Sequence, residues 1–216
     1  MQSPQKSSNH EHRNRLPLIT GVMMGLVAAI FVITPMTLFL LNPHYHGSVL
    51  WAKPVVADFS LSRADGGTFR LSDYKGRIVV LYFGYTTCPD VCPATLYNLT
   101  QMMKSLGAQS KQIAVIFITV DPATDTPEKM TEYLKAFDPA FIGLTGTAAQ
   151  LQPVYDQFQI TILRADQGRA AASIGIGHTT SLFVIDRQGR LRVELHEGDT
   201  AQGITNDIQN LLGESS

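Results

Sequence analysis

The chain has very little cysteine: among its 216 residues, Cys88 and Cys92 are the only two. A disulfide that stabilises a fold usually links distant segments, and these two residues are too close in sequence to do so. The chain also lacks an excess of basic residues. Its formal net charge is −1 and its charged content is 16%, so we expect no nucleic-acid partner. Internal repeats and low-complexity segments are missing too, which leaves an ordinary globular composition.

Charge is missing from one long stretch. No charged residue occurs in the 26 positions from Leu16 to Leu41. A helix needs about 20 apolar residues to cross a bilayer, so residues 16–41 are predicted to be a transmembrane anchor that Pro35 kinks. The apolar core of a cleaved signal peptide is shorter, about 7–15 residues, and no convincing small-residue cleavage site follows this stretch. An uncleaved anchor is therefore the preferred interpretation.

Basic residues lie before the apolar stretch and not directly after it. Lys6, Arg13 and Arg15 precede it, and the first basic residue behind it is Lys53. The positive-inside rule makes residues 1–15 a cytoplasmic tail and places the C-terminal part in the periplasm or another extracytoplasmic compartment. Thiols are exposed to oxidation there, so the cysteine pair is expected to be a disulfide unless it is reduced or bound to a metal.

Residues 42–54 are predicted to be a linker. The aromatic residues Tyr45 and Trp51 suit a membrane interface. His44 and His46 have the spacing of a two-ligand metal pair, but a polar spacer next to the membrane explains them more simply.

Strands and helices alternate over residues 55–216, which are numerous enough for one domain with its own core. The predicted strands cover 55–61, 66–74, 77–85, 112–121 and 141–146, with a hairpin over 181–195. One predicted helix begins near Val91 and ends at Gly107. Three more are predicted over 125–137, 147–160 (limited by Pro153) and 200–212. The runs 77–85 and 112–121 are continuously apolar, as in strands buried on both faces. The order predicts an α/β domain with a central mixed sheet flanked by helices.

The cysteine pair lies where the buried strand 77–85 ends and the next helix begins, the edge at which functional sites collect in open α/β sheets. Cys92 is expected in the first turn of that helix and Cys88 in the loop before it, where backbone N–H groups favour thiolates. A purely structural disulfide is disfavoured because so short a loop gains little from closure. Two alternatives remain: a thiol–disulfide exchange pair, whose usual spacing is one residue shorter, and a site for a soft cation such as Cu(I).

A copper site needs a third ligand, and the histidines differ in how well they could supply it. His10 and His12 precede the predicted anchor, and two more lie in the linker. His196 follows a hairpin strand and is expected to be a solvated surface residue. His178 enters the hairpin and is the best candidate, although a lone histidine is more often structural than a ligand.

Three stretches, "YFGYTTCPDVCP", "ITVDPATDTPEKMTEYLKAF" and "GHTTSLFVIDRQGRL", resemble the Sco/SenC family. Members are membrane-anchored proteins of thioredoxin-like fold that deliver copper to the binuclear copper site of cytochrome c oxidase. The resemblance runs from about residue 55 to about residue 212. It implies a thioredoxin-like fold here, with Cys88, Cys92 and His178 as the copper ligands.

The resemblance also places two family aspartates at Asp121 and Asp125. The chain departs from the family pattern at Thr124, where members often have arginine, and at Gly177, where many have an acidic residue. Thioredoxin-like exchangers carry a cis-proline where this chain reads "HTT", which favours a metal ligand at His178.

Together with this resemblance, the sequence predicts a copper-binding metallochaperone and not an enzyme with turnover. One copper per chain, as Cu(I) or Cu(II), would be held by Cys88, Cys92 and His178, with Asp90 a weak candidate for a fourth ligand of Cu(II). The implied partners are the copper-site subunit of cytochrome c oxidase, another copper chaperone as donor, and the membrane. Two alternatives stay open: a thiol–disulfide reductase that uses the cysteines as a redox-active disulfide pair, and a copper or redox sensor.

Overall fold

The computed structural model describes residues 23–24, 27, 29–34, 45–163, 177–178, 181–196 and 198–214. The chain divides into residues 1–43 and residues 44–216, and each unit is described by itself. Within the described residues, no helix has both the length and the apolar character needed to cross a membrane. Most of the predicted anchor over 16–41 lies outside the described residues, so the anchor stays a prediction.

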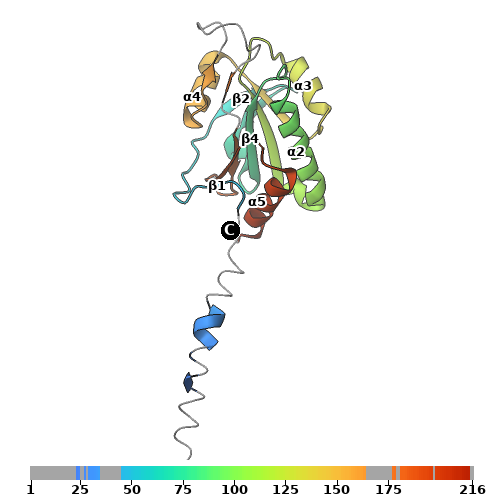
Figure 1. Cartoon of the computed structure of the whole chain (residues 1–216). Helices are drawn as coiled ribbons and strands as arrows, with labels where there is room; N and C mark the ends of the chain where they lie inside the picture. Colours follow the sequence, from blue (N-terminus) through green and yellow to red (C-terminus); the bar gives the residue numbers. More distant parts are fainter. Residues whose placement is uncertain are drawn as a thin grey trace, which may run out of the picture. The chain divides into compact units, whose positions relative to one another are not determined.

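The second unit is built on a mixed sheet, as predicted (Figure 1). In the described part of the chain its strand order is β1-β10-β9-β4-β5-β6-β2-β3. The strands are β1 (Ser48–Val49), β2 (Ser60–Arg63), β3 (Thr68–Arg70), β4 (Ile78–Gly84), β5 (Ile113–Thr119), β6 (Ile142–Thr145), β9 (Leu182–Ile185) and β10 (Leu191–Leu195). β5 pairs in parallel with both β4 and β6, and the other pairs are antiparallel. Two short strands, β7 (Ile162–Leu163) and β8 (Gly177–His178), pair separately.

β4 and β5 form the centre of the sheet, and every residue of both strands is buried. Successive side chains of a strand point to opposite faces, so Tyr82 and Phe83 face different helix layers. The Tyr82 ring contacts Phe117 of β5 on one face. On the other face, Phe83 contacts Tyr155 and Phe158 in and after the helix α4. The apolar runs of the sequence therefore correspond to strands covered on both sides.

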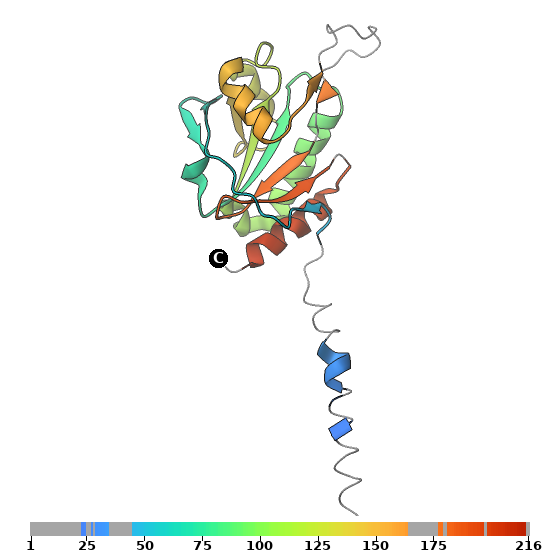
Figure 2. The same ribbon diagram turned by 90° about the vertical axis from the view of Figure 1, so that its left-hand side faces the viewer.

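Helices cover the two faces of the sheet unequally. They are α2 (Val91–Leu106), α3 (Pro127–Lys135), α4 (Ala148–Gln157) and α5 (Ala201–Gly213). α2, α3 and α5 lie on one face, and α4 lies on the other (Figures 1 and 2). α3 begins as predicted, because the Thr126 side chain accepts a hydrogen bond from the Lys129 N–H and Pro127 takes the first helical position. Pro153 does not limit α4, which tolerates the proline inside it and continues to Gln157.

Three segments differ from the sequence prediction. The strand predicted over 66–74 is short, because residues Leu71–Tyr74 form a 3₁₀ turn. In the run predicted as a strand over 55–61, Val55 makes only an isolated bridge to Arg190, and β2 begins at Ser60. The predicted linker over 42–54 contributes β1, which pairs with β10 at the edge of the sheet.

The start of this unit is held to the C-terminal helix. The buried Asp207 carboxylate of α5 accepts hydrogen bonds from the His46 and Gly47 N–H groups, both at 2.8 Å. The Tyr45 hydroxyl donates to Glu214 at 2.8 Å, so Tyr45 is engaged within the domain. Trp51, in contrast, is 87% exposed. We call the residues Tyr45, His46, Gly47, Asp207 and Glu214 the Asp207 cluster.

Candidate functional site

The cysteines lie at the junction of β4 and α2, as the sequence predicts. β4 ends at Gly84 and α2 begins at Val91, so Cys88 is in the connecting loop and Cys92 in the first helical turn. The Cys88 N–H donates to the Tyr85 carbonyl at 3.3 Å, which turns the loop. Both side chains are free thiols; Cys88 is half-buried and Cys92 is buried.

A hydrogen bond joins the two cysteines. The Cys92 N–H donates to the Cys88 Sγ at 3.4 Å. Asp90 is the N-cap of α2, yet its side chain makes no capping hydrogen bond. The Cys88 sulfur therefore accepts from one of the first-turn N–H groups that an N-cap side chain usually satisfies. This end of a helix favours negative charge, which suits thiolate and metal-bound sulfur.

The Cys92 sulfur lies directly against the backbone of β4. A Cβ atom on Gly84 would stand 3.1 Å from the Cys92 Sγ and 2.8 Å from the Phe117 Cε2, so only glycine fits there without a shift. Burial raises the pKa of Cys92 to about 12. Cys92 therefore keeps its proton at neutral pH until a metal displaces it.

A buried carboxylate fixes the loop that carries Cys88. Asp125 accepts hydrogen bonds from the Thr86 N–H at 3.0 Å, from the Thr86 hydroxyl at 2.5 Å and from the Thr119 hydroxyl at 2.6 Å. Asp121, the other aspartate implied by the resemblance, supplies its carbonyl to the Asp125 N–H at 2.9 Å. Asp125 thus ties the cysteine loop to the end of β5.

Sequence reasoning missed the partners of Asp125 and the phenol next to Cys92. Thr86 follows β4 and Thr119 ends β5. Because neighbouring parallel strands end at the same edge of a sheet, these positions were the one signal that could have predicted the partners of Asp125. The Tyr82 and Tyr133 hydroxyls are buried and have no hydrogen-bonding partner among the described residues. No feature of the sequence alone indicates that state.

His178 is placed by its backbone only. It lies in β8 opposite Ile162 of β7, and its side chain falls outside the described residues. Its part in a site with the cysteines therefore stays a prediction. Among the side chains that the structure describes, no three of the His, Cys, Asp and Glu types are grouped to hold a metal.

The other predicted ligand candidates occupy separate surroundings. Asp90 is exposed. His196 is exposed, as predicted, and its ring nitrogens lie 3.2 Å from the Ser48 Oγ and 3.4 Å from the Ser181 Oγ. The His46 Nδ1 lies 3.4 Å from Asp207. His10, His12 and His44 lie outside the described residues.

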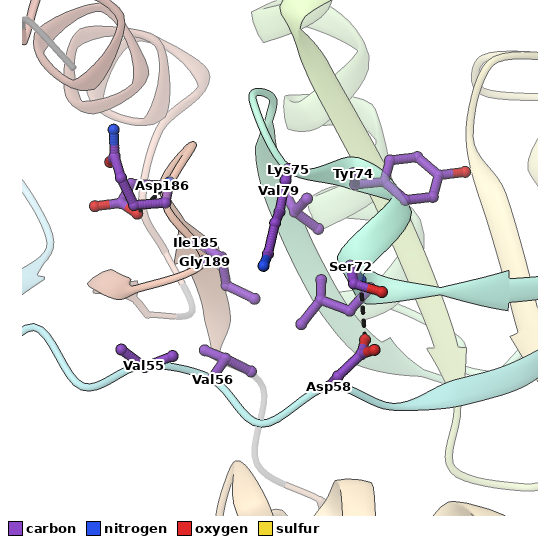
Figure 3. A pocket seen from close by; sticks show the side chains of 12 residues that line it. Val55, Val56, Asp58, Ser72, Tyr74, Lys75, Val79, Ile185, Asp186 and Gly189 are labelled. Atoms are coloured by element: carbon purple, nitrogen blue, oxygen red, sulfur yellow. Dashed lines mark hydrogen bonds between the residues drawn. The ribbon is translucent and has the colours of Figure 1, made fainter.

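Two cavities lie at different ends of the sheet. One, of about 300 Å³, adjoins the cysteine loop and includes Asp90, Val91 and His196 in its lining. The other, of about 200 Å³, lies where β4 begins and β9 ends, with Val79 and Ile185 among its lining residues (Figure 3). Its lining holds neither cysteine nor histidine, and its Asp58 carboxylate accepts the Ser72 N–H at 2.9 Å. Soft-metal or thiol chemistry therefore belongs to the cysteine loop.

Comparison with known proteins shows the family of the chain. The SCO1/SenC family profile matches residues 50–213, about three quarters of the chain. The chain belongs to the SCO1/SenC family. A SCO2-like protein of Rickettsia felis is 37% identical over 133 residues, which cover 62% of this chain and 65% of that protein. The match thus spans slightly less than two thirds of the Rickettsia relative.

Solved structures of Sco proteins confirm the thioredoxin-like fold. The apo Sco1 protein of Thermus thermophilus is 33% identical with a TM-score of 0.69, and the match covers 79% of this chain and 99% of that one. ScoI of Bradyrhizobium japonicum, solved with copper bound, is 28% identical with a TM-score of 0.65. That match covers 73% of this chain and 99% of the Bradyrhizobium chain.

Proposed function

We propose that this SCO1/SenC protein is a membrane-tethered metallochaperone that binds one copper ion and delivers it to the binuclear copper site of cytochrome c oxidase during assembly. The observation that carries the proposal is the pair of free thiols joined at the N-terminus of α2. The similarity of the chain to a Sco protein whose structure has been solved with copper bound supports the choice of metal.

The donor set fits copper as a cargo. Two thiolates from Cys88 and Cys92 with the imidazole of His178 would give Cu(I) the soft, low-coordinate site that it accepts. Cu(II) would require a further ligand, for which the exposed Asp90 at the start of α2 is a candidate. Because Cys88 is only half-buried, a receiving protein can approach this sulfur and exchange ligands with it.

The tether and the compartment are proposed from the charge pattern of the sequence. The uncharged stretch 16–41 would anchor the chain, with residues 1–15 in the cytoplasm and the copper domain in the periplasm or its equivalent. There the domain would receive copper from another chaperone and pass it to the oxidase subunit. A fusion of a reporter active only outside the cytoplasm, joined after residue 54, should be active; an inactive fusion would contradict this orientation.

One observation favours a second function, thiol–disulfide reduction of the oxidase's copper-ligand cysteines. A half-buried thiol next to a buried one resembles the attacking and resolving pair of an exchanger. The raised pKa of Cys92 makes it a poor attacking group, so Cys88 would attack and Cys92 would resolve.

The variant His178→Ala separates the two functions. A chaperone should lose Cu(I) affinity by at least about 100-fold, because a ligand is removed, while the rate of thiol–disulfide exchange stays unchanged. The exposed His196→Ala is the matched control and should keep wild-type affinity. Tight binding of one copper per chain by His178→Ala would show that the His178 imidazole is not a copper ligand.

A further inference from the structure

The Tyr82 hydroxyl is an unpaired polar group in the centre of the domain. Tyr82 is fully buried in β4, and its hydroxyl has no hydrogen-bonding partner among the described residues. A buried hydroxyl left unpaired is destabilising, and native proteins pair the great majority of such groups. This hydroxyl is therefore free to accept a partner that is present only in another state of the protein.

The strand geometry places Tyr82 and the Cys92 sulfur together. Tyr82 and Gly84 are two residues apart in β4, so their side-chain positions share one face of the sheet. On that face the Cys92 Sγ lies 3.1 Å from where a Gly84 Cβ would stand. The thiol of Cys92 and the side chain of Thr95, one turn further along α2, are the groups next to the Tyr82 hydroxyl.

Neighbouring aromatic rings fix the phenol in this place. The rings of Tyr82 and Phe117 meet edge to face with 5.8 Å between centroids, and Phe117 is 6.1 Å from the ring of Tyr133. Packing against the central strands leaves the Tyr82 side chain with no exposed surface. The hydroxyl therefore cannot turn toward bulk solvent, and the charge of the neighbouring Cys92 sulfur changes when that cysteine binds a metal.

A sulfur accepts hydrogen bonds well only when it carries negative charge. A protonated thiol is a weak acceptor, whereas a thiolate makes stronger, charge-assisted hydrogen bonds. A tyrosine hydroxyl keeps its proton at neutral pH and so can donate a hydrogen bond. Metal binding deprotonates the cysteine ligand and so creates the acceptor that the hydroxyl lacks.

We propose that Tyr82 is a positioning residue of the copper site whose hydroxyl donates a hydrogen bond to the Cys92 sulfur when copper is bound. The inference rests on the proposed function, in which Cys92 is a copper ligand. The hydroxyl is unpaired in the copper-free state and paired in the loaded state. It therefore favours loading, because it interacts differently with the two states.

The variant Tyr82→Phe removes only the hydroxyl. Its Cu(I) affinity, measured by competition with a chelator, should be about tenfold weaker than that of the wild type. The thermal midpoint of the copper-free variant should stay equal or rise, since an unpaired group is gone. In the Cu(II)-loaded protein, the thiolate-to-copper charge-transfer band should move to longer wavelength, because the sulfur loses a hydrogen bond. Tyr97→Phe, on the exposed side of α2, is the control and should change none of these.

Three results would overturn the inference. An unchanged affinity with an unmoved band would show that the hydroxyl does not meet the metal-bound sulfur. A copper-free Tyr82→Phe protein that is less stable than the wild type would show that the hydroxyl is already paired. If the wild type itself binds no copper, the proposed function fails first, and this role of Tyr82 fails with it.

Discussion

Two buried aspartates, Asp125 and Asp207, have the same structural role in two regions of the domain. Each carboxylate is almost completely buried and holds a segment that is distant in sequence. Asp125 binds the N–H of Thr86, 39 residues away, and Asp207 binds the N–H groups of His46 and Gly47, 161 and 160 residues away. One segment carries Cys88; the other begins the folded unit.

The surroundings of the two aspartates differ. Close to the Asp207 cluster the charges are paired, because Arg192 bridges Asp186 at 3.2 Å and Glu214 at 2.7 Å. Next to the loop held by Asp125, the Cys88 thiol is half-exposed and the Tyr82 hydroxyl is unpaired. In the Asp207 region the charged groups are paired with one another, although the buried Arg192 Nε has no hydrogen-bonding partner among the described residues. The Asp125 region is held rigid, and its half-buried thiol can still bind a ligand, which is what a binding site requires.

The variant Asp125→Asn should have the largest effect. An amide would replace a carboxylate that accepts from Thr86 and Thr119, so we expect a loss of about 3 kcal/mol in the free energy of unfolding. The cysteine loop would also lose its fixed position, so Cu(I) affinity should fall at least about tenfold. Chemical denaturation and chelator competition measure the two effects. Unchanged copper affinity would mean that Asp125 does not position the site.

The variant Asp207→Asn is the matched test in the other region. It removes the charge that holds two backbone N–H groups, and we expect a loss of about 2 kcal/mol in the free energy of unfolding. Its copper affinity should equal that of the wild type, because the Asp207 cluster does not contain the cysteine loop. A fall in affinity as large as that of Asp125→Asn would remove the distinction between the regions.

Acidification tests the paired charges of the Asp207 region. The Arg192 guanidinium, despite partial burial, holds the pKa of Glu214 below its ordinary value of 4.5. A lowered pKa contributes stability above the ordinary value and loses it as pH falls through the folded-state value. Glu214 is 37% exposed, so the contribution should be below about 1 kcal/mol. Unfolding measured from about pH 5 to about pH 3 should show this part of the acid sensitivity in the wild type and not in Glu214→Gln. The control Glu132→Gln, at an exposed position of α3, should behave as the wild type.

The variant His46→Ala should have the smallest effect. Asp207 holds the backbone N–H of His46, which alanine keeps, and the ring is 49% exposed. We expect a loss below about 1 kcal/mol and an unchanged copper content per chain. A fall in copper content would support the alternative that the linker histidines His44 and His46 bind a metal.

The central elements of the fold could be predicted because their signals are local. β4 and β5 are continuous apolar runs, and α3 begins with a capping threonine followed by proline. Gly107, predicted to end α2, has the left-handed φ of +52° that glycine adopts readily. The positions of both cysteines follow from the same local boundary between strand and helix.

The missed features depend on contacts between distant segments. β1 is only two residues long and exists because it pairs with β10, so the run 42–54 carries no strand pattern of its own. The hydrogen bond from the Thr86 N–H to Asp125 forms because two parallel strands end side by side. The unpaired state of the Tyr82 hydroxyl is a property of the packed core and has no counterpart in composition or spacing.

The central claim, a copper site at the cysteine loop, is tested most directly by metal analysis with X-ray absorption on the reduced, Cu(I)-loaded protein. We predict close to one copper per chain, bound by the sulfurs of Cys88 and Cys92 and one imidazole nitrogen. Copper that does not bind near one per chain, or binding without two sulfur ligands, would contradict the account.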